Sequence, residues 1–229
     1  MAGREPRHGL TDAARMLAFA DAHATLGGLM GDSDFPLLSA YLAGLPDGLA
    51  SYPECQTKAS IAHTFTDGHG FELRDDLPDS MAEFVRSPPP GGVWTSAVLA
   101  DAFFHLACDL FYPSEEATHR WCYRRTMRMA ESSLYRALFR FSSPRTFFAM
   151  SARTSRIFHR GTTITAEELT PDRAVSRFAF PPHLRSRRKL LSNLALSEAM
   201  IRLTGGRDPV VTLLEAGPTH ALFESRWQA

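Results

Sequence analysis

The sequence predicts an α+β fold, with a helical N-terminal half and a C-terminal antiparallel sheet of about four strands backed by helices. Two observations lead to this prediction. Apolar residues recur at helical spacing through most of residues 11–158. After Gly161 the hydrophobic pattern alternates with a period of two, and one helix interrupts it. Helices and strands that are segregated along the chain are typical of α+β domains.

The N-terminal third contains the start and stop signals of several short helices. Thr11 is a capping residue for a helix that should end near residue 29, at paired glycines. Pro36 occupies a favourable N1 position of the next helix. Further helix boundaries are expected near residues 35–43, 52–65 and 78–85.

Three helices are expected in the middle of the chain. Residues 94–111 are apolar on most sides, which predicts a central, largely buried helix. Asp101, His105 and Asp109 form a stripe on it, which we interpret as its solvent-facing side, although a histidine between two carboxylates is also typical of an acid–base site. Ser114 caps a second helix to about residue 141, and Ser143-Pro144 begins a third, to about residue 158.

The last third switches to strand-like alternation. Strands are expected at residues 161–165, 174–180, 210–214 and 219–227, with a helix at 185–203. Gly205-Gly206 is a helix-terminating signal, and Ala216-Gly217-Pro218 predicts a hairpin turn. In the last strand Ala221, Phe223 and Trp227 should share the buried face.

The proline-glycine segment at residues 87–92 is the clearest break between secondary-structure elements in the sequence, and it predicts a stiff connector. We therefore expect a helical region at residues 1–86, packed on an α+β domain at residues 93–229. The alternative is one single domain at residues 10–229. Both arrangements are long enough to bury a hydrophobic core.

Composition indicates a protein of a reducing compartment. Three cysteines are an odd number and do not form a disulfide framework, and the first residues lack the apolar run of a signal peptide. The most apolar segment contains Asp101, His105 and Asp109, which are costly in lipid, so no membrane span is expected. These features predict a cytoplasmic location.

Charge is distributed unevenly although the net charge is zero. Residues 1–113 contain 6 basic and 15 acidic residues, whereas residues 114–229 contain 19 and 10. Such asymmetry occurs in proteins that bind nucleic acid, but also where two halves neutralise each other. No helix-turn-helix, zinc-finger or RNA-binding motif accompanies it, so a nucleic-acid partner is not expected.

Several segments resemble a paralogous family of myxobacterial proteins of unknown function, about 200 residues long. The resemblance is carried by residues 41–49, Ser51-Tyr52-Pro53-Glu54-Cys55, Ser143-Pro144, Phe158-His159-Arg160-Gly161, Pro181-Pro182-His183-Leu184 and Phe223-Glu224-Ser225-Arg226-Trp227. The C-terminal half is also similar in layout to 4-vinyl-reductase-like and haem nitric-oxide-binding-like domains. This similarity implies a bacterial protein with helices against a small antiparallel sheet, and a small apolar ligand between them.

Two departures from those domains bear on what is expected of this chain. The 4-vinyl-reductase-like domains often carry cysteines in their last part, whereas no cysteine follows Cys122 here. The Tyr-x-Ser-x-Arg motif that holds haem propionates is absent. The resemblance therefore predicts no particular cofactor, and it transfers no catalytic residue.

Four side chains form the sharpest candidate site for a metal. His105 and Cys108 lie three residues apart on one predicted helix, and His119 and Cys122 repeat this spacing on the next. If the two helices form a hairpin around Pro113, two histidines and two cysteines suit tetrahedral Zn²⁺. The competing interpretation is that the cysteines fill space in the core, as buried cysteines often do.

Known catalytic motifs are absent from the sequence, including the nucleophile elbow, the phosphate loop, the dinucleotide fingerprint and the HExxH helix. The basic cluster Arg185, Arg187, Arg188 and Lys189 starts a helix where an anion can bind, but we interpret it as a solvated face. The sequence therefore favours a function other than catalysis.

Three functions are consistent with these features. The first is a small-molecule-binding or sensory and regulatory domain, with an apolar pocket of at least about 300 Å³ between helices and sheet. Its expected lining residues are Trp94, Phe104, Phe178, Phe180 and Phe223. The second is a protein-interaction module that forms a homodimer through apolar helices. The third is a metal protein or enzyme built on the His/Cys pairs.

Overall fold

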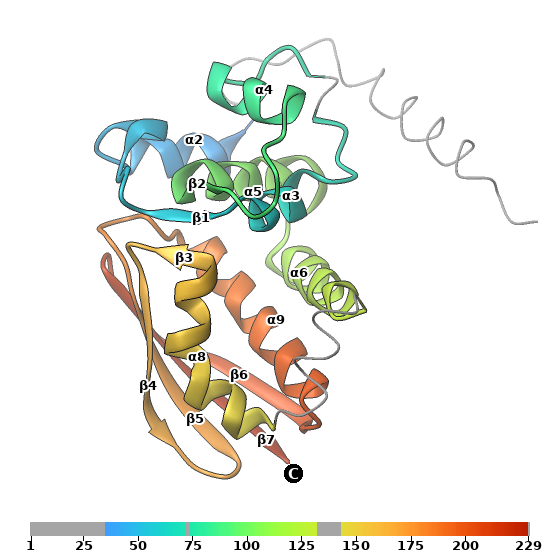
Figure 1. Ribbon diagram of the computed structural model, residues 1–229, viewed down its shortest axis with the longest axis vertical. Coiled ribbons are helices and arrows are strands. Elements are labelled where there is room, and N and C mark those ends of the chain that lie inside the picture. The colour runs from blue at the N-terminus through green and yellow to red at the C-terminus, as the bar shows by residue number, and fades with distance from the viewer. Residues whose placement is uncertain (1–34, 72–73, 132–142, 229) are drawn as a thin grey trace, which may run out of the picture. The chain divides into compact units, whose positions relative to one another are not determined.

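The computed structural model describes residues 35–71, 74–131 and 143–228, and residues 35–229 form one compact unit. Within these residues helices combine with two antiparallel sheets, which confirms the predicted α+β class (Figure 1). The helix expected at residues 11–29 lies outside the described residues. The expected boundary between residues 86 and 93 stays a prediction.

Most predicted helices are present with small shifts of their ends. The helical elements are α2 (Pro36–Ala43), η2 (Gly48–Ala50), α3 (Ala59–Thr66), α4 (Asp79–Arg86), α5 (Ala97–Phe111), α6 (Glu115–Met129), α8 (Pro144–Phe158) and α9 (Arg187–Leu203). Ser114, Ser143 and Ser186 cap α6, α8 and α9 through side-chain hydrogen bonds. Beyond residue 131, the long helix predicted to residue 141 lies outside the described residues.

A three-stranded sheet was not predicted from the sequence. It consists of β1 (Gln56–Lys58), β2 (Trp94–Ser96) and β3 (His159–Arg160), in the order β2-β1-β3. The helix expected at residues 52–65 therefore begins only at Ala59, and the one expected from residue 94 begins at Ala97. Strands of two or three residues are too short to show alternation, and their pairing partners lie far apart in the sequence.

The four-stranded sheet matches the predicted strands and has the order β4-β5-β7-β6. Its strands are β4 (Thr163–Leu169), β5 (Arg173–Ala179), β6 (Arg207–Ala216) and β7 (His220–Gln228). Ser176 pairs with Phe223, and Phe178 with Ala221, across β5 and β7. As predicted, Ala221, Phe223 and Trp227 are buried on one face of β7.

Helices cover one face of the four-stranded sheet. Helix α8 packs against β4 and β5, and α9 packs against β6 and β7 (Figure 1). Phe148 of α8 stacks on Trp227 of β7, with ring centroids 5.5 Å apart. Helix α6 packs against α9, which brings its C-terminal half close to the space between the helices and the sheet.

Helix α5 is the centre of the larger hydrophobic core, as its apolar composition predicted. Its residues from Ala97 to Cys108 are buried, except Leu99. The solvent stripe predicted on it is wrong, because Asp101 and His105 are each only 1% exposed. Asp109, which is half-buried, accepts hydrogen bonds from the Leu37 and Leu38 amides at the start of α2, each 3.0 Å long. The carboxylate thereby satisfies free N–H groups of that helix.

Gly161, between β3 and β4, leaves no room for a Cβ atom because Cys55 and Glu54 pack against it. Its φ is +73°, and an added Cβ would lie 2.9 Å from the Cys55 Cα and 3.1 Å from the Glu54 carbonyl oxygen. Gly161→Ala is therefore expected to lower the free energy of unfolding by about 3 kcal/mol, as strain and overpacking add. Urea unfolding measures this loss.

Gly205→Ala is the matched control for that substitution. Gly205 has φ +93°, but no described atom lies within 4 Å of an added Cβ. Its replacement should cost only the backbone strain, about 1–2 kcal/mol. Equal losses for the two variants would show that the approach of Cys55 to Gly161 is not tight.

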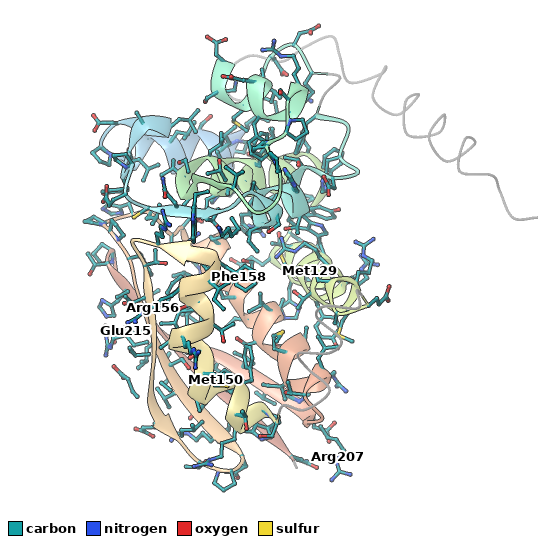
Figure 2. All side chains as sticks on the ribbon, in the orientation of Figure 1. Met129, Met150, Arg156, Phe158, Arg207 and Glu215 are labelled. Atoms are coloured by element: carbon teal, nitrogen blue, oxygen red, sulfur yellow. The ribbon has the colours of Figure 1, made fainter. Side chains whose placement is uncertain are left out.

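No helix in the described part of the chain is both long and apolar enough to cross a membrane. Large apolar side chains that face solvent are scattered over several elements, with Met150 and Ile157 on α8 and Val210 and Leu214 on β6. Met150, which is 47% exposed, is labelled in Figure 2. The homodimer and the cytoplasmic location stay predictions.

Candidate functional site

A partly enclosed cavity of about 190 Å³ lies between the helices and the inner face of the four-stranded sheet. Helices α3, α5, α6, α8 and α9 and strands β4, β5 and β7 each contribute to its wall. Met129, at the end of α6, is one of its lining residues (Figure 2). Its volume is below the 300 Å³ expected of the predicted pocket, which stays a prediction.

The wall of the cavity is mainly apolar. Its apolar residues among those described are Ile61, Phe65, Ala97, Ala100, Met129, Phe147, Phe148, Ile164, Phe178, Leu196 and Phe223. Phe178 and Phe223 belong to this wall. They lie on neighbouring strands and face the helices because alternate residues of a strand share a face.

The other three residues of the predicted lining lie outside this wall. The Trp94 ring is covered by the Lys58 ammonium and the Arg160 guanidinium, at 3.9 and 4.0 Å from its centroid. Phe104 is buried in the core around α5, stacked on Trp121. Phe180, 5% exposed, packs edge-on against Phe178. Ligand contacts for all five aromatic residues stay predictions.

A buried ionic cluster forms the polar side of the cavity. The Asp101 carboxylate accepts a hydrogen bond from Arg185 Nη1 at 2.5 Å and lies 3.2 Å from the Lys189 ammonium. Burial raises the pKa of Asp101, but Arg185 and Lys189 outweigh it and hold the pKa below its usual value. Burial lowers the pKa of Lys189 to about 8. Asp101 is thus an anion shared by two cations.

Arg125 adds a third cation to the cavity wall. Its guanidinium lies over the ring of Phe65 at 4.4 Å and near that of Trp121 at 5.5 Å. Its Nε and Nη1 atoms are buried and have no hydrogen-bond partner among the described residues. Aromatic faces stabilise a guanidinium but leave its N–H donors free. Arg125 therefore brings a positive charge and unused donors to the cavity.

Unpaired polar atoms concentrate at this cavity. Nine buried side-chain nitrogen or oxygen atoms lack a hydrogen-bond partner in the described part of the chain, and six of them belong to residues of the cavity wall. Besides Nε and Nη1 of Arg125, these are Ser151 Oγ, His159 Nδ1, Ser176 Oγ and Arg185 Nε. An unpaired buried polar atom costs about 1–3 kcal/mol, so such a concentration marks a place for a polar ligand or water.

Sequence reasoning missed this polar side of the cavity. The cluster at the start of α9 was interpreted as a solvated face, which is wrong for Arg185 and Lys189, at 8% and 7% exposure. The interpretation holds for Arg187, whose side chain is 70% exposed. The available signal was Asp101, a lone carboxylate at the start of an otherwise apolar helix, which requires a buried cation as partner.

Three of the four predicted metal ligands have other side-chain contacts among the described residues. His105 donates a hydrogen bond from Nδ1 to the Asp101 carbonyl at 2.6 Å, and its Nε2 lies 2.6 Å from Ser186 Oγ. His119 Nε2 lies 3.1 Å from a Glu198 carboxylate oxygen.

Cys108 Sγ lies 3.6 Å from Thr118 Oγ1, and Cys122 is buried. The described residues contain no group of three His, Cys, Asp or Glu side chains that could hold a metal ion. Burial lowers the pKa of His105 to about 4, which favours the neutral imidazole. The metal site itself stays a prediction.

A second hollow lies on the other side of Arg185. It is more open, with a volume of about 660 Å³, and its lining includes Tyr41, His183, Arg187 and Arg188. Arg188 donates a hydrogen bond to the Pro113 carbonyl at 2.6 Å, and Arg187 lies 3.7 Å from Glu115. Its arginines are therefore already partnered within the described chain, unlike Arg125.

Comparison with solved structures identifies the architecture. An oxygen-binding H-NOX domain related to soluble guanylate cyclases superimposes with a TM-score of 0.53 and 11% identity, over 74% of this chain and 92% of that domain. The chain has an H-NOX-like fold. A structure from a study of haem distortion in the H-NOX family gives a TM-score of 0.51 at 12% identity, over 75% of this chain and 95% of that one.

Identities this low establish the H-NOX-like fold alone. A mutant of the T. Tengcongensis H-NOX gives a TM-score of 0.50 at 15% identity, over 74% of this chain and 94% of that one. No family model matches the sequence, and no curated protein matches it. The predicted similarity to haem nitric-oxide-binding-like domains is thus confirmed at the level of the fold.

Proposed function

We propose that this chain is a non-enzymatic, sensory or regulatory small-molecule-binding domain whose ligand occupies the cavity between the helices and the four-stranded sheet. The observation that carries the proposal is the combination found at that cavity: an apolar wall and a concentration of unpaired polar atoms. Sites for small ligands typically have mostly apolar walls with a few converging polar groups.

The size of the cavity sets the class of ligand. An engineered, apolar cavity of about 150 Å³ in another protein binds benzene. A volume of about 190 Å³ is therefore suited to one aromatic ring with a short substituent. The H-NOX-like fold supports a sensory function, since the structural neighbours include an oxygen-binding domain.

Haem, the subject of one of the neighbouring structures, does not fit this cavity. Drug-sized ligands need about 300–1,000 Å³, and a porphyrin is at least that large. Lys189 and Asp101 contribute to the wall, and the Lys189 ammonium lies against the rings of Phe65 and Phe104, at 3.9 and 4.4 Å. His159 is the histidine among the described wall residues that could face an iron. The residues present thus favour a smaller ligand.

Filling the cavity tests the proposal. Ser176 on β5 lines the cavity, is 9% exposed, and has an unpaired hydroxyl. Ser176→Leu should leave the protein folded, since it replaces an unsatisfied polar group, and should weaken ligand binding at least about tenfold because the added side chain occupies the cavity. Calorimetry with benzoate, benzyl alcohol and benzylamine, and native mass spectrometry of the purified protein, measure binding.

Thr165→Leu is the matched control, because Thr165 is exposed on β4 of the same sheet. It introduces the same side chain outside the cavity and should leave binding unchanged. The proposal is wrong if none of the three probes binds and no small molecule accompanies the purified protein. It is also wrong if Ser176→Leu binds as tightly as the parent.

We propose in addition that the chain belongs with the paralogous myxobacterial proteins it resembles. Two of the resembling segments meet beside the three-stranded sheet, where the Cys55 thiol donates a hydrogen bond to the Gly161 carbonyl at 3.5 Å. Tyr52 also donates a hydrogen bond to the Pro182 carbonyl at 2.8 Å, which joins a third segment. A solved structure of a member that lacks these contacts would contradict the assignment.

A further inference from the structure

We propose that the cavity selects a compact organic anion, such as an aromatic carboxylate, and that the Arg125 guanidinium is the group that binds its charge. This inference rests on the proposed function and names the ligand class for the same cavity. It follows from the balance of charges in the wall, from the kind of hydrogen-bonding atoms left unpaired there, and from the apolar surface beside them.

Charge is the first argument. The described wall contains the cations Arg125, Arg185 and Lys189 but a single carboxylate, Asp101. Asp101 is shared by Arg185 and Lys189, at 2.5 and 3.2 Å, and no ion pair is formed by Arg125 with any described acid. Uncompensated buried charge is strongly unfavourable, so the wall has an excess of positive charge that an anion would neutralise.

The second argument is the chemistry of the unpaired atoms. Nε and Nη1 of Arg125 and Nε of Arg185 can only donate hydrogen bonds, and all three are unpaired among the described residues. The hydroxyls of Ser151 and Ser176, also unpaired, can donate as well. A ligand that supplies only acceptor oxygens, as a carboxylate does, matches these five of the six unpaired atoms, the sixth being His159 Nδ1, whose role depends on its tautomer. An ammonium group would instead add donors and positive charge.

The third argument is the apolar surface that continues from these donors. Phe65 lies under the Arg125 guanidinium, and Phe178 and Phe223 lie on the sheet side of the same cavity. Aromatic faces pair well with an aromatic ring in offset or edge-on geometry. Within about 190 Å³ the wall thus offers a charged end and an apolar end for one ligand.

Binding measurements with three benzene derivatives of similar size test the anion selectivity of the cavity. Calorimetry compares benzoate, benzyl alcohol and benzylamine on the full chain. Benzoate is expected to bind tenfold to a hundredfold more tightly than benzyl alcohol, which is about the range for hydrogen bonds that involve a charged group. Benzylamine is expected to be the weakest. This comparison needs no variant and is independent of how any variant folds.

Arg125→Met tests the role assigned to Arg125. The variant should lose about tenfold to a hundredfold in benzoate affinity and keep its affinity for benzyl alcohol. Its ligand-free form should unfold at a higher temperature than the parent, since a half-buried guanidinium that has no ion-pair partner among the described residues is replaced by an apolar side chain. Arg124→Met is the matched control, because Arg124 is the exposed neighbour on α6, and it should change neither affinity.

The outcomes distinguish a failure of the anion selectivity from a failure of the proposed small-molecule function. If benzyl alcohol binds in the cavity as tightly as benzoate, or more tightly, the anion inference is overturned and the small-molecule function stands. The same holds if Arg125→Met binds benzoate like the parent. If no probe binds and Ser176→Leu changes nothing, the proposed function and the inference that rests on it both fall.

Discussion

Asp101→Ala is expected to lower the free energy of unfolding by about 3–5 kcal/mol, which is the range for removing one partner of a buried ion pair. The carboxylate is 1% exposed and compensates Arg185 and Lys189, both of which are also buried. Without it, two cations remain in the wall of a cavity that already contains Arg125. Chemical denaturation at neutral pH measures the loss.

The loss arises from the cations that are left behind rather than from the pair itself. Replacing all three groups by apolar side chains of similar volume, as Asp101→Leu with Arg185→Met and Lys189→Met, should restore most of the stability. Ligand binding should not return, because the polar side of the cavity is gone. A triple variant as unstable as Asp101→Ala would contradict this explanation.

Asp109→Ala is the matched control on the same helix. Asp109 is half-buried and accepts hydrogen bonds from two amides at the start of α2, so it acts as a capping group. Its removal should cost about 1 kcal/mol, the typical value for the loss of a cap. Two aspartates eight residues apart on one helix should thus differ severalfold in their effect.

Acidification from pH 6.5 to pH 4 is expected to destabilise the protein through buried neutral histidines. Burial lowers the pKa of His105 to about 4 and that of His69 to about 4, from an ordinary 6.5. In this pH range the unfolded chain binds more protons than the folded one, so stability is complete above pH 6.5 and is lost as the pH falls. For His105 the loss is about 3 kcal/mol by pH 4.

The surroundings of His105 explain why it resists protonation. Its ring stacks on Tyr41 at 4.4 Å between centroids, and both nitrogens are already engaged, with the Asp101 carbonyl and Ser186. Burial is the largest cause, and the nearby charges of Lys189 and Arg188 act in the same direction. The Asp101 carboxylate opposes them without reversing the shift.

His105→Gln separates this proton linkage from packing. The variant should be less stable at pH 7 but should lose less stability between pH 6.5 and pH 4, because one titrating group is absent. Leu106→Ala, at the next and fully buried position, is the control: it should lower stability and keep the pH dependence of the parent. Urea midpoints at half-unit pH intervals check both. Parallel curves for His105→Gln and the parent would exclude His105 as a source.

The sequence by itself determined most of the described helices and the larger sheet, because their signals are local. Apolar spacing, serine caps and proline positions predicted α2, α4, α8 and α9 to within a few residues. Alternation predicted the buried face of β7 correctly. Each of these features depends on residues that are neighbours along the chain, so no knowledge of distant contacts was needed.

Only the tertiary structure revealed the small sheet and the polar side of the cavity. Gln56 pairs with Arg160, which lies more than a hundred residues later in the sequence. Strands this short also carry no periodic signal. Asp101 is likewise far from Arg185 and Lys189 in the sequence, so no local pattern indicates that these three side chains meet.

On the sequence, Asp101 belongs to a plausible solvent stripe, and Lys189 to a basic helix start. Burial changes both interpretations, because a charge removed from water requires a partner or a ligand. The sequence thus determined which elements form and which faces are apolar. The fold alone decided that three cations and one carboxylate share a cavity, since side chains from α5, α6, α9 and the segment before α9 come together only when the helices pack on the sheet.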